Sequence, residues 1–369
     1  MKRRDFAKGL AFGAAAGIIG TVAVNHANPS SNEKSKKPKK VLMHVGSQQA
    51  FGSSDKDMQF LARCGVWHKS LNAPYSREKG IPLEEVLKLK DQCEKHGISL
   101  DVLDLPFRKM NVEGGSIMNV MLGNFDKGEK ECDQFCEMIR TSARASIHCL
   151  LYSLKIIENQ RTERTIGRGG SRYSSWDLEK AKDRPPRFEK PVTEDMAWER
   201  ITFFLDRVIP AAEEYKVRMV CHPEDPWFPH GYRNSYRPLG GPEGFKRFIK
   251  TNPSSYNGLV FCLGCMSEAC DNPAEEVYDI IRYFGKRKRI FHVHFRNIRG
   301  GRNKFQEVWP DEGDVNMYKA MKVFKEVEYP YMLVPDHSPG HTDDPGSYQG
   351  FAFQFGYIKA LIQAVSEEE

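Results

Sequence analysis

The chain has 369 residues, of which 40% are hydrophobic and 28% charged, and this composition is typical of a folded globular protein. Its formal net charge is +6, but nine basic and two acidic residues lie within the first 40 positions, which leaves 46 basic and 47 acidic side chains in the remainder. A body with a net charge of −1 argues against nucleic acid as a partner. The basic excess belongs to an N-terminal segment.

This N-terminal segment has the pattern of an export signal. The pair Arg3 and Arg4 precedes an apolar stretch over residues 10–24, which small residues follow. Paired arginines in this context resemble a twin-arginine signal, which carries folded proteins across a membrane. We expect a signal peptide over residues 1–27, a polar linker over 28–40, and a periplasmic or exported protein. An uncleaved anchor is the alternative, but 15 apolar residues are few for a membrane span.

Cysteines occur at an odd number of positions, nine in all: 64, 93, 132, 136, 149, 221, 262, 265 and 270. Exported proteins usually pair their cysteines in disulfides. A protein that folds in the reducing cytoplasm before export can instead bury free thiols or use them as metal ligands. The twin-arginine interpretation therefore allows a thiolate in a functional site.

From residue 41 onward, short β-branched or aromatic runs alternate with longer amphipathic stretches, the pattern of repeated βα units. Eight such runs predict strands: Val41–Gly46, Gly65–Leu71, Ile98–Pro106, Ala145–Ser153, Val217–Pro223, Gly258–Gly264, Arg289–Asn297 and Tyr331–His337. Helices are predicted between or after them, for example over Leu83–His96, Glu129–Ala143, Thr193–Tyr215, Pro273–Phe284, Val315–Glu326 and Gly350–Val365. The sequence predicts an α/β fold, a single-domain (β/α)8 TIM barrel over residues 41–369, with a functional loop over 154–192.

Four consecutive predicted strands end in residue types that bind metals. The fifth ends at His222, the sixth at Cys262, the seventh at His292 and His294, and the eighth at Asp336. Because the active site of such a barrel forms at the carboxyl ends of its strands, we expect these side chains to converge. Nitrogen, sulfur and oxygen donors together suit a first-row divalent ion with positions open to substrate.

Two residues in these segments have alternative interpretations. His292 lies on the same face as His294 and is either a hydrogen-bonding partner of a ligand or a buried core group. Cys265 forms a CxxC with Cys262, but without a second such pair we interpret it as a packing residue.

Several of these segments resemble the successive motifs of mannonate dehydratases, in the same order. The similar segments are His222-Pro223-Glu224-Asp225-Pro226, Asn257-Gly258-Leu259 before Phe261-Cys262, His294-Phe295-Arg296, Asp311-Glu312-Gly313-Asp314-Val315-Asn316-Met317-Tyr318, Pro335-Asp336-His337 and Pro345-Gly346-Ser347-Tyr348. The resemblance is close from residue 200 to the C-terminus and looser over 41–200. In one departure, Arg161-Thr162-Glu163 stands where better-known members have Arg-Thr-Asp. That departure and the export signal indicate a divergent member.

The resemblance implies a xylose isomerase-like barrel that dehydrates D-mannonate to 2-keto-3-deoxy-D-gluconate and water. The implied ligands of Mn²⁺ or Fe²⁺ are His222, Cys262, His294 and Asp336. The implied acid/base pair is His337 and Tyr348. Such a reaction removes a proton next to a carboxylate, so a divalent ion stabilises the resulting charge, and His and Tyr are suited to moving protons.

Three arginines are candidates for binding the carboxylate or hydroxyls of the substrate: Arg164, Arg168 and Arg296. Exposed arginines often only solvate a loop, and His337 and Tyr348 could instead have structural roles. The expected partner is a small sugar acid. The sequence is also compatible with a homo-oligomer. A metal-dependent sugar isomerase or epimerase on the same barrel is the alternative function. A binding protein without turnover is a third, against which the presence of His337 and Tyr348 argues.

Overall fold

The computed structural model describes residues 41–48, 51–76, 79–105 and 118–368. The predicted signal peptide and linker lie outside these residues. Residues 39–369 group into one compact unit, which contains the whole barrel. Within the described ranges, no helix combines the length and apolar character that a membrane crossing requires.

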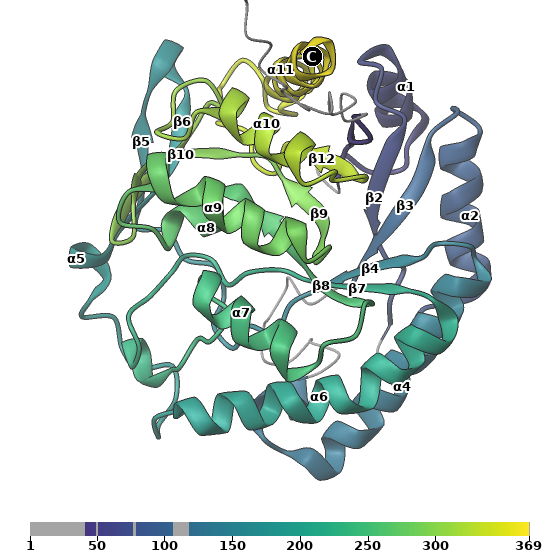
Figure 1. The fold of residues 1–369 in the computed structure, drawn as a ribbon, viewed down its shortest axis with the longest axis vertical. Coiled ribbons are helices and arrows are strands. Elements are labelled where there is room, and N and C mark those ends of the chain that lie inside the picture. The colour runs from purple at the N-terminus through teal and green to yellow at the C-terminus, as the bar shows by residue number, and fades with distance from the viewer. Residues whose placement is uncertain (1–40, 49–50, 77–78, 106–117, 369) are drawn as a thin grey trace, which may run out of the picture. The chain divides into compact units, whose positions relative to one another are not determined.

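Eight parallel strands form the barrel, and each overlaps one of the eight predicted runs (Figure 1). They are β1 (His44–Val45), β2 (His68–Asn72), β3 (Ser99–Asp104), β4 (Cys149–Tyr152), β7 (Arg218–Cys221), β8 (Asn257–Cys262), β9 (Ile290–His294) and β12 (Met332–Val334). The prediction of a (β/α)8 barrel is therefore confirmed. Its basis was the alternation of apolar runs and amphipathic stretches, which parallel pairing with helical crossovers produces.

The strands are hydrogen-bonded in the order β1-β12-β9-β8-β7-β4-β3-β2. Between β2 and β1 the pairing is reduced to one parallel bridge, Ser47 with Lys69. There the Ser47 N–H donates to the His68 carbonyl at 2.9 Å, and the Ser70 N–H donates to the Ser47 carbonyl at 2.8 Å. The β1–β2 junction is thus held by fewer backbone hydrogen bonds than the β2–β3 ladder.

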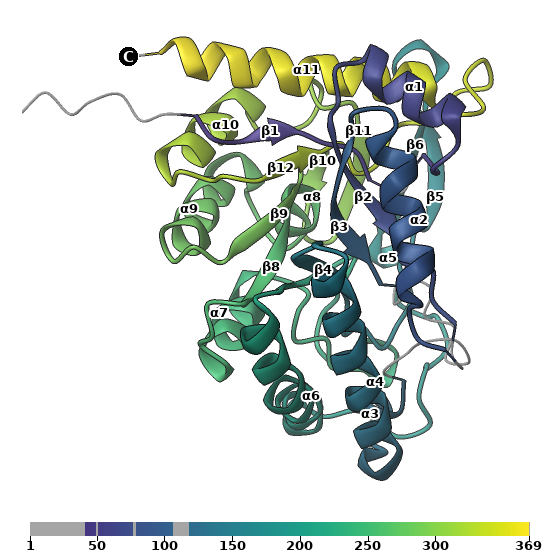
Figure 2. The same cartoon turned by 90° about the vertical axis from the view of Figure 1, so that its right-hand side faces the viewer.

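Helices follow the strands and surround the barrel (Figures 1 and 2). They are α1 (Asp55–Arg63), α2 (Leu83–Glu94), α3 (Met118–Leu122), α4 (Phe125–Arg144), α5 (Leu178–Ala181), α6 (Glu194–Tyr215), α7 (Pro242–Thr251), α8 (Leu263–Glu268), α9 (Pro273–Lys286), α10 (Met317–Glu326) and α11 (Tyr348–Glu367). Local sequence defines their first turns: Thr193 caps α6 by accepting the Met196 N–H, and Pro242 and Pro273 open α7 and α9. Helix α6 buries a face that includes Ile201 and Leu205, each worth about 1.5–3 kcal/mol of transfer free energy.

A second, antiparallel sheet is built from two insertions. Its strands are β5 (Glu163–Ile166), β6 (Arg172–Asp177), β10 (Asn297–Gly301) and β11 (Lys304–Val308), paired in the order β10-β11-β6-β5. The segment predicted as a long loop over 154–192 contributes β5, β6 and α5 to this arrangement. The hairpin β10–β11 follows β9 directly, so both insertions leave the barrel at the carboxyl ends of its strands.

The barrel interior is filled by apolar side chains between its two ends. Val102, Leu151, Val220, Val260 and Met332 belong to this interior cluster, and all are nearly or fully buried. A larger apolar layer packs between the strands and the surrounding helices. Because the interior is solid, the polar groups at the two ends of the barrel form separate sites.

Candidate metal centre

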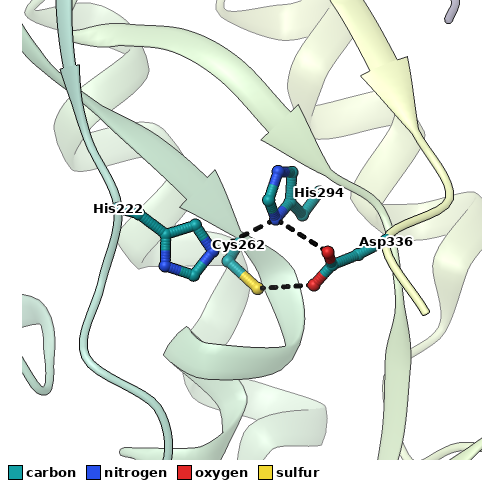
Figure 3. A group of neighbouring side chains, drawn as sticks. All are labelled: His222, Cys262, His294 and Asp336. Atoms are coloured by element: carbon teal, nitrogen blue, oxygen red, sulfur yellow. Dashed lines mark hydrogen bonds and ion pairs between the residues drawn. The ribbon is translucent and has the colours of Figure 1, made fainter. Parts of the chain in front are cut away.

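The four predicted ligands converge at the carboxyl ends of four neighbouring strands. His222 directly follows β7, Cys262 and His294 are the last residues of β8 and β9, and Asp336 comes two residues after β12. One donor atom from each lies within 4.8 Å of the other three. Figure 3 shows the four side chains pointing toward one another.

The distances between these side chains are short enough for all four to bind one metal ion. His222 Nε2 lies 3.2 Å from His294 Nδ1, which is 3.3 Å from Asp336 Oδ1. Cys262 Sγ lies 3.7 Å from Asp336 Oδ2. All four residues are buried, His222 being the most exposed at 8%. Two imidazoles, a thiol and a carboxylate at this spacing fit a first-row divalent cation.

The surroundings of Cys262 favour the thiolate, which is the form that binds metals. Its Sγ accepts a hydrogen bond from the Cys265 backbone N–H at 3.4 Å, at the start of α8. Burial raises the pKa of the thiol, but a hydrogen bond with the Cys265 side chain and the charge of Arg296 bring it well below its usual range. The two imidazoles act in the same direction.

Asp336 is held in place from two sides. The Gln48 side-chain amide donates to Oδ1 at 2.7 Å, and Arg296 Nε donates to Oδ2 at 3.0 Å. Burial raises the pKa of this carboxyl, but nearby His294, His337 and Arg296 keep it well below its usual range. Asp336 is therefore ionised, as a carboxylate ligand of a cation must be.

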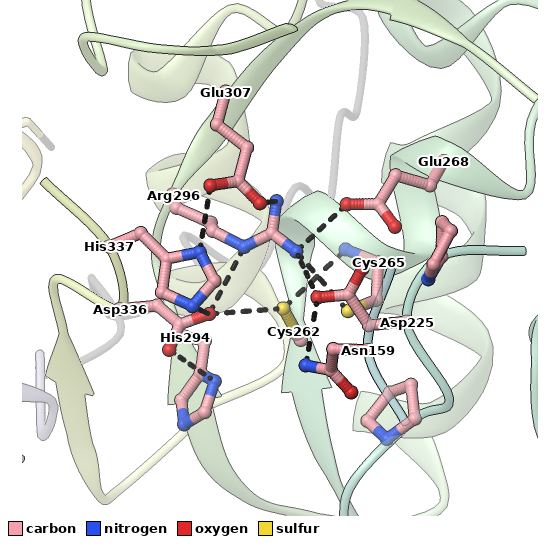
Figure 4. A network of polar contacts seen from close by, with 12 residues as sticks. Asn159, Asp225, Cys262, Cys265, Glu268, His294, Arg296, Glu307, Asp336 and His337 are labelled. Atoms are coloured by element: carbon pink, nitrogen blue, oxygen red, sulfur yellow. Dashed lines mark hydrogen bonds and ion pairs between the residues drawn. The ribbon is translucent and has the colours of Figure 1, made fainter. Parts of the chain in front are cut away.

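Arg296 occupies the centre of a buried polar network (Figure 4). It is 2% exposed and forms ion pairs with Glu268 at 2.8 Å and with Asp225 at 3.6 Å, besides its contact with Asp336. A Cβ on Gly264 would come within 2.1 Å of its guanidinium, so only glycine leaves room for this side chain. Among the described residues no hydrogen bond is made by its Nη1.

The network around Arg296 also includes Cys265. Asp225, Cys265 and Glu268 also lie within ligand distance of one another. Arg296 already contacts all three, with Nη2 donating to Cys265 Sγ at 3.3 Å. The guanidinium thus fills the position that a metal ion would take between these three residues. Cys265 is therefore a buried packing and hydrogen-bonding residue. His292 is also fully buried, with its ring edge-on to His294 at 5.1 Å between centroids.

His337 lies beside the predicted ligands but is oriented by another residue. Its Nδ1 donates to Glu307 Oε2 at 2.9 Å, while its Nε2 is 3.7 Å from Asp336 Oδ2. Burial lowers the pKa of this imidazole, but Asp336 and Glu307 outweigh that effect and raise it to about 9. The structure thus brings His337 to the four-residue group.

A cavity of about 300 Å³ opens over this region and is lined by His337, Arg164 and Arg296, three of the predicted site residues. An adjoining cavity of about 380 Å³ is lined by Asp336 and also by His337. Arg168 is absent from both linings, and its guanidinium forms two hydrogen bonds to Asp311 at 2.6 and 2.9 Å.

Tyr348 lies at the edge of this region. It is the first residue of α11, and its neighbour Ser347 lines the 300 Å³ cavity. Its hydroxyl donates to Asp57 at 2.7 Å, and its ring packs against Phe51 and Phe60. The structure brings together the four ligand candidates, His337, Arg164 and Arg296, and places Tyr348 and Arg168 at the periphery.

Three site residues were not singled out in the sequence. Glu307 lies on β11, Glu268 ends α8, and Gln48 follows β1. The alternation Lys304-Phe305-Gln306-Glu307-Val308 after a Gly-Arg-Asn turn is a hairpin signal that could have placed Glu307 near the site. Glu268 and Gln48 carry no comparable signal, because their roles come from packing against distant residues.

Comparison with known proteins agrees with this site. A family model described as D-mannonate dehydratase (UxuA) matches residues 174–369, which include all four ligand candidates, His337 and Tyr348. The mannonate dehydratase of Thermotoga petrophila is 28% identical over 326 residues, which cover 78% of this chain and 87% of that protein.

Solved structures share the fold. The crystal structure of mannonate dehydratase from Streptococcus suis serotype 2 matches with a TM-score of 0.73 and 23% identity, covering 89% of this chain and 93% of that one. That of 3-keto-D-glucoside 4-epimerase from E. coli matches with a TM-score of 0.57 and 12% identity, covering 87% and 100%. The sequence match spans more than half of the chain and contains the converging side chains, and the chain therefore belongs to the D-mannonate dehydratase (UxuA) family.

Proposed function

We propose that this protein catalyses the metal-dependent dehydration of D-mannonate to 2-keto-3-deoxy-D-gluconate and water. The observation that carries the proposal is the group of four buried donors within 4.8 Å, next to His337 and below a cavity lined by arginines. The family match supports the same reaction, since relatives in it are named mannonate dehydratases.

His222, Cys262, His294 and Asp336 would hold Mn²⁺ or Fe²⁺. The donor set supports this assignment, because imidazole, thiolate and carboxylate together suit a first-row ion better than a hard cation such as Mg²⁺ or Ca²⁺. When bound, the cation supplies Lewis-acid stabilisation for the negative charge that develops on the substrate.

The protein's own acid/base groups move two protons. One is taken from C2 of the hexonate, and one is delivered to the C3 hydroxyl as it leaves as water; the resulting enol then becomes the 2-keto product. We assign one transfer to His337 and the other to Tyr348, which would act from the edge of the site, where its hydroxyl now donates to Asp57. Because Nδ1 of His337 is engaged by Glu307, Nε2 is the nitrogen that would exchange the proton.

Two arginines would orient the substrate. Arg164 lines the cavity, and Arg296 retains an Nη1 donor that makes no hydrogen bond among the described residues. Both would donate to the carboxylate or hydroxyls of the sugar acid. Arg168 would contribute indirectly, since its pairing with Asp311 connects the turn after β5 to the segment after β11.

We also propose that the protein is exported in folded form by a twin-arginine signal. Arg3 and Arg4 with the apolar stretch behind them support this proposal. The nine cysteines, all of which lie in the described residues and are free thiols, are compatible with folding in the reducing cytoplasm before export. Disulfide-free proteins that use a thiolate are suited to folding before translocation.

The experiment that tests the reaction is incubation of the purified protein with Mn²⁺ and a panel of hexonates, with product analysis by mass spectrometry. We expect D-mannonate to lose one water and to give a 2-keto-3-deoxy acid. A product of unchanged mass, either a ketose or an epimer, would instead establish the isomerase or epimerase alternative. Binding without any product would point to a sugar-acid-binding protein.

A further inference from the structure

A second group of potential ligands lies at the opposite end of the barrel. His44 and His68 are the first residues of β1 and β2, and Asp101 is the third residue of β3. One donor atom from each lies within 4.8 Å of the other two. Because the strands are parallel, these residues meet at the amino-terminal end, away from His222 and its neighbours.

The three side chains are close but incompletely bonded to one another. His68 Nδ1 lies 2.7 Å from Asp101 Oδ2, and the two imidazole centroids are 3.8 Å apart. His44 Nε2 is buried and, among the described residues, has no hydrogen-bond partner, since Asp101 Oδ2 is 4.0 Å away. A buried ring nitrogen beside a carboxylate that is too distant to accept from it is a position where a cation would be favourable.

The group is accessible to ions from solvent. The side chains of His44, His68 and Asp101 are 32%, 35% and 29% exposed. His44 and Asp101 line a cavity of about 400 Å³, and His148 lines the same cavity. The cationic side chains on this cavity are already engaged. Lys90 donates to the Ala145 carbonyl at 3.1 Å, and Arg218 lies over the Tyr331 ring.

We propose that His44, His68 and Asp101 form a second metal site, which binds Zn²⁺. Two imidazole nitrogens and one carboxylate oxygen are ligands that zinc accepts, and the open side leaves room for water at the remaining positions. Hard cations such as Mg²⁺ and Ca²⁺ prefer oxygen ligands throughout and do not suit this set.

The position of the site indicates what the ion does. It connects β1, β2 and β3 at the junction where, in the part of the chain that the structure describes, β1 and β2 share only the Ser47–Lys69 bridge. An ion held by His44 and His68 crosslinks these two strands, which share fewer backbone hydrogen bonds than β2 and β3 do. Its effect is therefore on the stability of the barrel, independent of any reaction at the carboxyl ends of the strands.

The proposal is tested by counting metal ions on the full chain without an affinity tag. The protein is loaded with Mn²⁺, equilibrated with Zn²⁺ and desalted, and total transition metal per chain is measured by mass spectrometry. Four variants are compared: Asp101→Asn, His68→Gln, Cys262→Ser and, as a matched control from the same cavity, His148→Gln. Because the total is counted, exchange of Mn²⁺ for Zn²⁺ at the His222 group does not affect the result.

We expect two ions per chain in the parent and in His148→Gln, and one in Asp101→Asn and His68→Gln. Added Zn²⁺ should raise the Tm of the parent and of Cys262→Ser, but not that of Asp101→Asn. Cys262→Ser, which weakens only the other site, should keep one ion even if the Asp101 variant fails to fold. A metal count that does not fall by one ion from the parent to Asp101→Asn and His68→Gln, or no ion in Cys262→Ser, would overturn the proposal. Neither readout depends on dehydratase activity, so the two proposals can fail separately.

Discussion

Glu307 and His337 are joined by a hydrogen bond of 2.9 Å that connects the second sheet to the barrel. The carboxylate fixes which imidazole nitrogen faces the cavity and raises the pKa of the ring. Replacing Glu307 by Gln should lower kcat about 10- to 100-fold with a smaller change in KM, as for other residues that orient a reactive group. The pH dependence of kcat should shift to lower pH, because the imidazole loses a neighbouring charge. Glu163→Gln, on exposed β5, is the matched control; an unshifted profile in Glu307→Gln would contradict the positioning role.

His337 itself should affect turnover without affecting metal binding. The His337→Asn variant should keep its metal and lose on the order of 10²–10⁴-fold in kcat, the usual contribution of a general acid or base. Metal analysis beside steady-state kinetics separates the two properties. His96→Asn, whose imidazole contacts Asp55 far from the cavity, should behave as the parent does. Full activity in the His337 variant would show that this imidazole transfers no proton.

Cys262 should determine metal content. Because a neutral hydroxyl is a poorer ligand than a thiolate, Cys262→Ser should lower bound Mn²⁺ or Fe²⁺ and activity in parallel. Cys270→Ser provides a control at another buried thiol, whose Sγ donates to the Met266 carbonyl. Full occupancy of the His222 group in Cys262→Ser would remove the thiol from the ligand set.

Lys69 should make the free energy of unfolding vary with pH in the alkaline range. Burial lowers the pKa of this amine from 10.5 to about 8, and its Nζ donates to the Phe51 carbonyl at 2.9 Å. Between these two values the unfolded chain binds a proton at Lys69 that the folded chain has released, so the contribution of Lys69 to stability should rise as the pH increases through this window. Lys69→Met should flatten this rise by up to about 1.4 kcal/mol per pH unit. Urea denaturation of both proteins across the window measures it, and parallel curves would contradict the assignment.

Export should depend on both N-terminal arginines. Replacing Arg3 and Arg4 together by Lys should retain the protein in the cytoplasm, since the twin-arginine route recognises the pair. Fractionation followed by immunoblotting checks this result, with Lys34→Arg and Lys36→Arg in the linker as a charge-neutral control. Unchanged export would indicate the general secretory route.

The barrel and the convergence of the four ligand candidates could be predicted from sequence because both depend on short-range patterns. The strands β7, β8, β9 and β12 are largely apolar runs, and His222, Cys262, His294 and Asp336 stand where these runs end, so the parallel topology alone brings them together. The network around Arg296 could not be predicted in this way. Its partner Glu307 is brought in by a hairpin, and the pairing of that hairpin with β6 depends on contacts between segments more than 100 residues apart.

The pairing of β11 with β6 also limits how this enzyme can be altered. Residues 163–177 and 297–308 leave the barrel after different strands but share one sheet, through the register of Phe305 with Trp176. An exchange of either insertion for that of a relative would leave its partner strand without a complementary edge. The two segments therefore form one structural unit. Chimaeras that exchange both segments together should fold, whereas chimaeras that exchange only one should not.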